Sequence, residues 1–133
     1  MSRWPTRDEV GAAWHGLLDG SLTREKVHDW AVPWVEGAEV GQPPDGLVES
    51  AMQTLHGFTM TFDPATPHLV HHGPPGTYLK SAADMRSDLD RWERACCEHD
   101  QDPAGWRAER LAVAQAYLDQ HRQVPNEWRC TPS

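Results

Sequence analysis

Residues 6–26 read TRDEVGAAWHGLLDGSLTREK, and this stretch predicts two consecutive helices joined at a glycine. Thr6 and Glu9 have the spacing of a capping box, in which the threonine side chain accepts a hydrogen bond from the first turn and the glutamate reaches back. Gly20 stands where a left-handed C-terminal cap is expected, and Thr23 is placed to cap a second helix. Between the caps, apolar side chains recur at helical spacing and predict one buried stripe. They are Val10, Ala13, Trp14, Leu17 and Leu18.

The same reasoning predicts helices further along the chain. The second helix has an apolar stripe from Val27 to Val35, and we expect Pro33 to kink it or to stop it early because proline lacks an N–H. A third helix is predicted over residues 47–56, a fourth is capped by Ser81, and a fifth opens at residues 102–103. In the fifth helix, Trp106 lies on a stripe that we expect to face the core.

The segment between the third and fourth helices predicts β-structure. Residues 58–62 alternate apolar and polar side chains, which is typical of a strand, and residues 68–72 have the length of a returning strand. We therefore expect a mainly α fold. It is a single helical domain over residues 1–133, a small bundle of about five helices, with a short β-hairpin inserted near 58–72. The termini, 1–5 and 123–133, are expected to pack loosely.

Composition excludes several classes of function. The 133 residues have 12 Lys and Arg against 20 Asp and Glu, a formal net charge of −8, so the chain is poorly suited to binding nucleic acid. No apolar run reaches the roughly 18 residues of a membrane span, and the first residues lack the apolar segment of a signal peptide. Three cysteines are an odd number, which favours free thiols in a reducing compartment. We expect a cytoplasmic protein that uses neither nucleic acid nor a membrane as its partner.

The charge pattern suggests a binding surface. No Lys or Arg occurs between Lys26 and Lys80, although this interval contains six carboxylates. Such a field attracts a cationic partner and speeds its association, so we expect a basic protein partner such as a toxin or an enzyme. The expected contacts are Asp29, Glu36, Glu39, Asp45 and Glu49. The alternative is an acidic surface that only keeps the protein soluble. Arginines that reach these carboxylates from either end of the chain would remove the docking surface and favour the histidine site considered next.

The second candidate site is a cluster of histidines. His68, His71 and His72 lie within five residues, close after Asp63, and His56 ends the preceding helix. Imidazole and carboxylate are ordinary ligands of zinc and other divalent transition metals. On a strand, His68 and His72 share one face, so the candidate metal ligands are His56, Asp63, His68 and His72. They would serve a small metal-dependent or acid–base enzyme. The alternative is a polar loop with solvent-facing histidines, because the spacing matches no specific zinc motif.

The turn between the first two helices carries a resemblance. Residues 17–25 read LLDGSLTRE and are followed by Val27 and Trp30. This opening resembles that of the bacterial colicin D-type self-protective immunity proteins, and it also looks like that of small helical proteins of actinobacteria. The resemblance implies a small helical bundle that inhibits a nuclease toxin by covering its basic active site with acidic side chains. It implies no catalytic residue for this chain and no cofactor.

Overall fold

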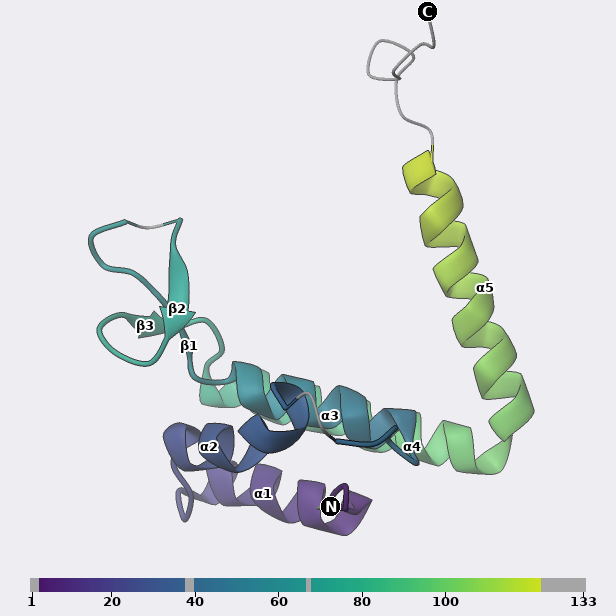
Figure 1. Cartoon of the computed structure of the whole chain (residues 1–133), viewed down its shortest axis with the longest axis horizontal. Coiled ribbons are helices and arrows are strands. Elements are labelled where there is room, and N and C mark those ends of the chain that lie inside the picture. The colour runs from purple at the N-terminus through teal and green to yellow at the C-terminus, as the bar shows by residue number, and fades with distance from the viewer. Residues whose placement is uncertain (1–2, 38–39, 67, 123–133) are drawn as a thin grey trace, which may run out of the picture. The chain divides into compact units, whose positions relative to one another are not determined.

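The computed structural model describes residues 3–37, 40–66 and 68–122. Over these ranges five helices and three short strands follow one another, which confirms the mainly α fold (Figure 1). The helices are α1 (Arg7–Asp19), α2 (Arg24–Val35), α3 (Gly46–Gly57), α4 (Ala82–Gln101) and α5 (Pro103–Arg122). The strands are β1 (Met60–Phe62), β2 (Val70–His72) and β3 (Thr77–Tyr78). Contacts divide the chain into two compact units, Met1–Arg94 and Ala95–Ser133.

The predicted helix caps are present. The capping box of Thr6 and Glu9 is formed in both directions, and Gly20 has the left-handed backbone with φ 82°. Thr23 Oγ1 accepts from the backbone N–H of Lys26 at 3.1 Å. The expected early stop at Pro33 does not occur, because α2 continues to Val35. The proline lies in the last turn, where the missing N–H affects only one hydrogen bond of a helix that is about to end.

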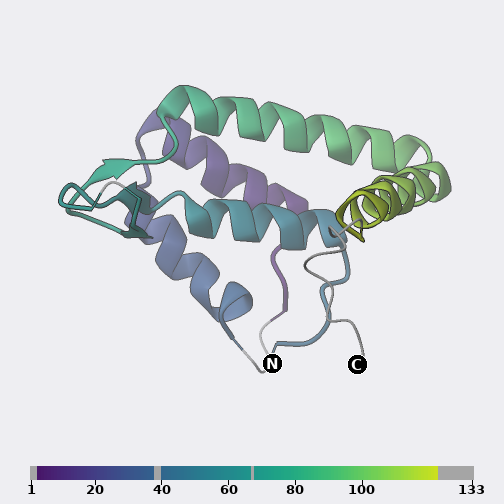
Figure 2. The same ribbon diagram turned by 90° about the horizontal axis from the view of Figure 1, so that it is seen from above.

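Trp14 is at the centre of the core of the first unit. Its side chain is 1% exposed, and its Nε1 donates to the backbone oxygen of Met85 in α4 at 2.9 Å. The ring stacks on Trp92 of α4 at 5.8 Å and meets Phe58 edge-on at 5.7 Å. Trp92 in turn donates to the backbone oxygen of Leu47 in α3 at 2.8 Å. These contacts hold α1, α3 and the first part of α4 side by side (Figure 2).

A small antiparallel sheet lies where α3 ends and α4 begins (Figure 1). Its strand order is β2-β1-β3, so the predicted hairpin is confirmed and gains a third strand that the sequence did not predict. Gly76 makes this third strand possible, because its φ is +131° and a Cβ there would collide with the backbone oxygen of Phe62. The register places His72 opposite Met60, close to the end of α3.

The N-terminal segment packs more closely than we expected for residues 1–5. Trp4 packs against the core, its Nε1 donates to the backbone oxygen of Gly41 at 2.9 Å, and Pro5 is buried. Residues 1–2 and 123–133 lie outside the described residues, so the expected loose packing there stays a prediction.

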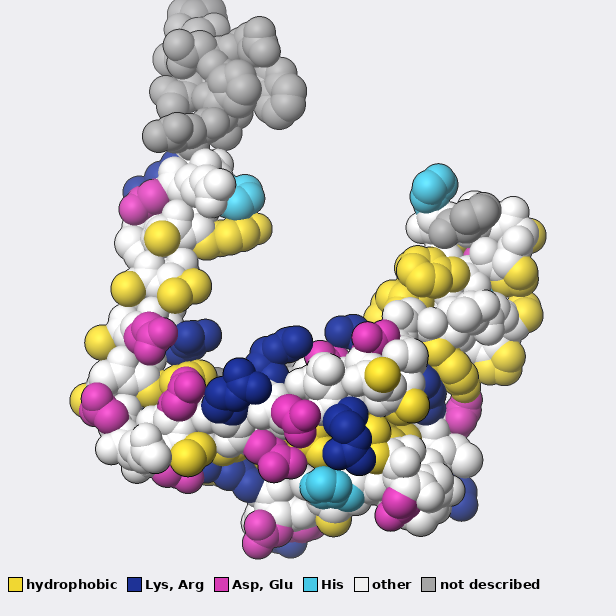
Figure 3. Space-filling view, turned by 180° about the vertical axis from the view of Figure 1, so that it is seen from behind, with side chains coloured by type: hydrophobic (Ala, Val, Ile, Leu, Met, Phe, Trp, Pro, Cys, Tyr) yellow, Lys and Arg dark blue, Asp and Glu magenta, His cyan; other side chains and the backbone are white. Residues whose placement is uncertain are grey.

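The second unit consists of the end of α4 and of α5. Over the described residues α5 contributes no buried side chain, so the expected core-facing stripe on this helix is wrong. Trp106 is half-buried, and Leu111, Val113, Tyr117 and Leu118 are exposed, as the yellow side chains along α5 show in Figure 3. An apolar stripe needs a partner surface, and the described part of this unit, residues 95–122, contains only one other helical segment, the end of α4. Within the described part of the chain, no helix is both long enough and apolar enough to cross a bilayer.

Candidate metal centre

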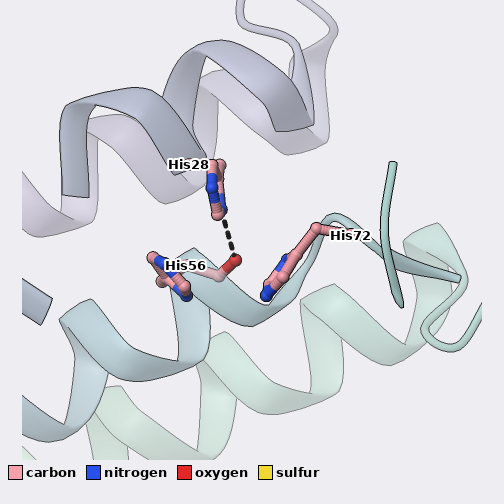
Figure 4. Close-up of side chains that lie close together, drawn as sticks. All are labelled: His28, His56 and His72. Atoms are coloured by element: carbon pink, nitrogen blue, oxygen red, sulfur yellow. Dashed lines mark hydrogen bonds between the residues drawn. The ribbon is translucent and has the colours of Figure 1, made fainter. Parts of the chain in front are cut away.

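Three histidines from three separate elements of the first unit meet at one point. His28 comes from α2, His56 from the last turn of α3 and His72 from the end of β2 (Figure 4). The ring centroids are 4.2 Å apart for His28 and His56, 4.8 Å for His28 and His72, and 5.0 Å for His56 and His72. One nitrogen of each ring lies within 4.8 Å of the corresponding nitrogens of the other two. Among the described residues this is the one group of three or more potential ligands that is close enough to share a metal ion.

Local structure explains why these rings meet. Only two residues separate His56 from Thr59, so the chain turns from α3 into β1 without a long loop. β2 then runs antiparallel to β1 and pairs His72 with Met60, which returns His72 to the end of α3. α2 packs along α3 and brings His28 over the same point (Figure 4).

Hydrogen bonds fix which nitrogen of two rings carries the proton. His28 Nδ1 lies 3.0 Å from the backbone oxygen of His56, the bond drawn as a dashed line in Figure 4. A carbonyl oxygen only accepts, so Nδ1 of His28 is the donor and Nε2 keeps the lone pair of the neutral ring. His56 Nε2 lies 3.0 Å from Oε2 of Glu36, which leaves the lone pair on Nδ1 of His56 by the same reasoning. Both rings therefore keep one unprotonated nitrogen for a ligand.

The hydroxyl of Thr59 links the three histidines. The residue is 2% exposed, and its Oγ1 lies 2.6 Å from Nδ1 of His72 and 3.2 Å from Nδ1 of His28. The same hydroxyl lies 3.4 Å from the backbone oxygen of His56. Because a hydroxyl can accept as well as donate, Thr59 can accept a hydrogen bond from the Nδ1–H of His72, which leaves the lone pair of this ring on Nε2. Metal-bound histidines are held by hydrogen-bond partners of this kind on the second ring nitrogen.

Two groups at the cluster, Glu36 and His72, have lowered pKa values. The hydrogen bond with His56 is the main cause that lowers the pKa of Glu36, burial opposes it, and positive charge on His56, His28 and His72 lowers this pKa further when those rings are protonated. Partial desolvation lowers the pKa of His72, and His28 and His56 lower it further, whereas Glu36 opposes the shift. Neutral imidazole is the form that binds a metal, so His72 is ready to do so at neutral pH.

The geometry is close to that of a zinc site. In a tetrahedral site with Zn–N bonds of about 2.0–2.1 Å, the nitrogens lie about 3.3 Å apart. The nitrogen–nitrogen separations here are at most 4.8 Å, so they would have to shrink by up to about 1.5 Å, which small side-chain rotations can supply. Three histidine ligands leave a fourth position for water or another ligand.

Two of the four metal ligands expected from the sequence belong to this cluster. His56 and His72 take part in it, whereas Asp63 and His68 do not. Asp63 accepts from the backbone N–H groups of the following turn and lies 3.5 Å from His71, and His68 is exposed and precedes β2. His28 was not predicted as a ligand, because the packing of α2 on α3 brings it to the site and no local spacing in the sequence indicates this.

The five acidic residues expected to contact a partner have different surroundings. Asp29 is exposed, Glu36 is bonded to His56, and Glu39 lies outside the described residues. Asp45 caps α3 through the N–H of Leu47 at 3.0 Å and forms an ion pair with Arg7 at 2.6 Å. Glu49 is half-buried and lines a cavity. The pairing of Asp45 with an arginine from the N-terminal segment is of the kind that weakens an acidic docking surface. The basic protein partner stays a prediction.

Comparisons with known proteins give no further guidance. No protein-family model matches the chain, and searches of curated proteins and of solved structures found no match. The case for a function therefore rests on the residues and their geometry.

Proposed function

We propose that the protein binds one divalent transition metal, with zinc as the expected ion, through His28, His56 and His72. The observation that supports this most strongly is the meeting of three imidazoles whose candidate ligand nitrogens lie within 4.8 Å of one another. The hydrogen bonds from His28 to a carbonyl oxygen and from His56 to a carboxylate add support, because they leave a lone pair free on each ring.

A metal at this point joins elements that are distant in sequence. It connects α2, α3 and β2 in the first unit and so stabilises the fold around the sheet. Its fourth position takes a water molecule or an exchangeable ligand, as in zinc sites with three protein ligands. A metal-dependent enzyme requires such an open position. Enzyme activity would depend on the proposed metal binding, whereas the proposed metal binding does not depend on enzyme activity.

The ligand set is tested with cobalt, because tetrahedral Co²⁺ absorbs visible light and zinc does not. Protein made without a histidine tag is stripped with chelator and titrated with Co²⁺, and then with Zn²⁺ as competitor. We expect one equivalent of metal per chain, a visible spectrum of a four-coordinate site, and displacement of cobalt by zinc.

Two neighbouring variants make this experiment specific. His72→Ala removes a proposed ligand, whereas His71→Ala removes a histidine of the same strand that lies outside the cluster. We expect the cobalt spectrum to disappear in the first variant and to persist in the second. An unchanged spectrum in His72→Ala, or no stoichiometric binding by the parent protein, contradicts the proposal.

A further inference from the structure

A cavity of the first unit, lined by none of the three clustered histidines, has a different chemistry. It has a volume of about 220 Å³ and lies between the N-terminal segment, the end of α2, residues 40–43 and α3. Its lining residues are Trp4, Trp34, Val35, Val40, Gly41, Gln42, Pro43, Glu49 and Gln53. Pockets for drug-sized ligands are typically about 300–1,000 Å³, so this cavity suits a small group and not a large cofactor.

The two tryptophans offer aromatic surface and no free hydrogen-bond donor. Trp4 Nε1 donates to the backbone oxygen of Gly41 at 2.9 Å, and Trp34 Nε1 donates to that of Arg3 at 3.2 Å. Each indole N–H therefore has a partner within the protein, and these bonds also restrain the rings. What remains for an occupant is the π-system of the indoles, the strongest aromatic partner of a cation.

The charge of the cavity has one sign. Among the described residues that line it, Glu49 is the only charged one, and none is Lys or Arg. All lining residues except Trp4 come from the interval between Lys26 and Lys80, which has no Lys or Arg. The guanidinium of Arg3 donates to the backbone oxygen of Trp4 at 3.2 Å and to Glu9 at 2.7 Å, so its charge is paired with a carboxylate that does not line the cavity. An anion is therefore disfavoured here and a cation is favoured.

We infer that this cavity binds a quaternary ammonium group of a small molecule, held by Trp4, Trp34 and Glu49. A trimethylammonium group is weakly hydrated, donates no hydrogen bond and gains from aromatic faces and one carboxylate. A primary ammonium is strongly hydrated and needs several acceptors in place of its water. This site is separate from the histidine cluster and does not depend on a metal.

Choline is the probe, and its neutral carbon isostere dimethylbutanol is the control for shape. Binding of each to the full chain is measured by calorimetry in the presence of chelator, so that metal binding plays no part. Heteronuclear NMR follows the indole N–H signals of the seven tryptophans in parallel. We expect choline to bind at least about tenfold more tightly than the isostere and to shift two indole signals, those of Trp4 and Trp34.

Matched variants assign the charge. Glu49→Gln keeps the size of the side chain and is expected to weaken choline binding about fivefold or more, whereas Asp90→Asn, at an exposed position on α4, is expected to leave it unchanged. Trp34→Leu is expected to weaken it about tenfold. Equal binding of choline and the isostere, no effect of Glu49→Gln, or no binding of choline to the parent protein overturns the inference.

Discussion

Zinc should raise the thermal stability of the protein through a residue that the sequence did not single out, His28. The change is His28→Ala, and the assay is the shift in Tm on adding zinc to chelator-treated protein. For each variant the measured quantity is the Tm with zinc minus the Tm without zinc. An effect of the substitution on the stability of the metal-free protein therefore cancels. His68→Ala is the matched control, because His68 belongs to the histidine run of the sequence but is exposed and lies outside the cluster.

The magnitude follows from binding to the folded state alone. At a free zinc concentration 100 times the Kd, binding stabilises the folded state by about 2.7 kcal/mol. For a chain of this size, 1 kcal/mol shifts Tm by about 4 °C, so the parent protein and His68→Ala should gain about 10 °C. Loss of a hydrogen-bond partner of a metal ligand weakens metal binding by at most about a hundredfold, and loss of the ligand itself should weaken it at least as much. With a Kd that is a hundredfold higher, zinc at the same concentration stabilises the folded state by only about 0.4 kcal/mol. His28→Ala should therefore gain about 2 °C or less at the same zinc concentration.

Two results would refute this reasoning. If His28→Ala keeps the full zinc-dependent shift, α2 does not supply a ligand and the cluster of Figure 4 is only a polar contact. If His68→Ala loses the shift, the metal binds to the linear histidine run and the tertiary arrangement is irrelevant to it. A loss in His28→Ala together with retention in His68→Ala is the outcome that the structure predicts.

Three further changes test other parts of the first unit by urea denaturation. Asp45→Ala removes both a helix cap and an ion pair and should cost about 1–3 kcal/mol, whereas the exposed Asp29→Ala should stay within about 0.5 kcal/mol; equal losses would mean that the cap and the pair contribute nothing. Tyr78→Phe removes the hydrogen bond that lowers the pKa of Glu25 below 4.5, so the stability advantage of the parent over this variant should be full above pH 4.5 and decline as pH falls through the lowered pKa. An advantage that is the same at pH 7 and pH 3 would argue against this pairing. Gly76→Ala forces a side chain into a φ of +131° and into the backbone of β1, so it should cost at least about 1–3 kcal/mol, and a neutral effect would contradict the described register of β3.

The helices and their ends were predictable because their signals are local. A capping box spans four residues, and an apolar stripe repeats every three or four. The helix α1 can therefore be predicted from Thr6, Glu9 and Trp14 without knowledge of the rest of the chain. The strand β1 was predictable for the same reason, since alternation is visible within five residues. The strand β3 was not, because it is two residues long and exists only through its pairing with β1.

The histidine site was half predictable. His56 and His72 were predicted as ligands because other histidines lie close to them in the sequence. The strand predicted over residues 68–72 also included His68, which was therefore predicted as a ligand too. The actual strand begins at Val70, so the alternation argument did not apply to His68. Ion pairs between residues distant in the sequence could not be predicted either. Sequence counts placed Asp45 among free carboxylates, and the fold gave it Arg7 as a partner.

Sequence alone determined the helical elements, their caps, the buried stripe of α1 and the acidic interval without lysine or arginine, because each depends on residues within a few positions or on a simple count. The tertiary structure decided that His28 joins His56 and His72, and that Glu49 and two tryptophans line one cavity. The physical reason is that these meetings depend on how α2 packs on α3 and on the register of β2 against β1. Both are set by the burial of side chains from the whole unit, and no short stretch of the chain contains that information.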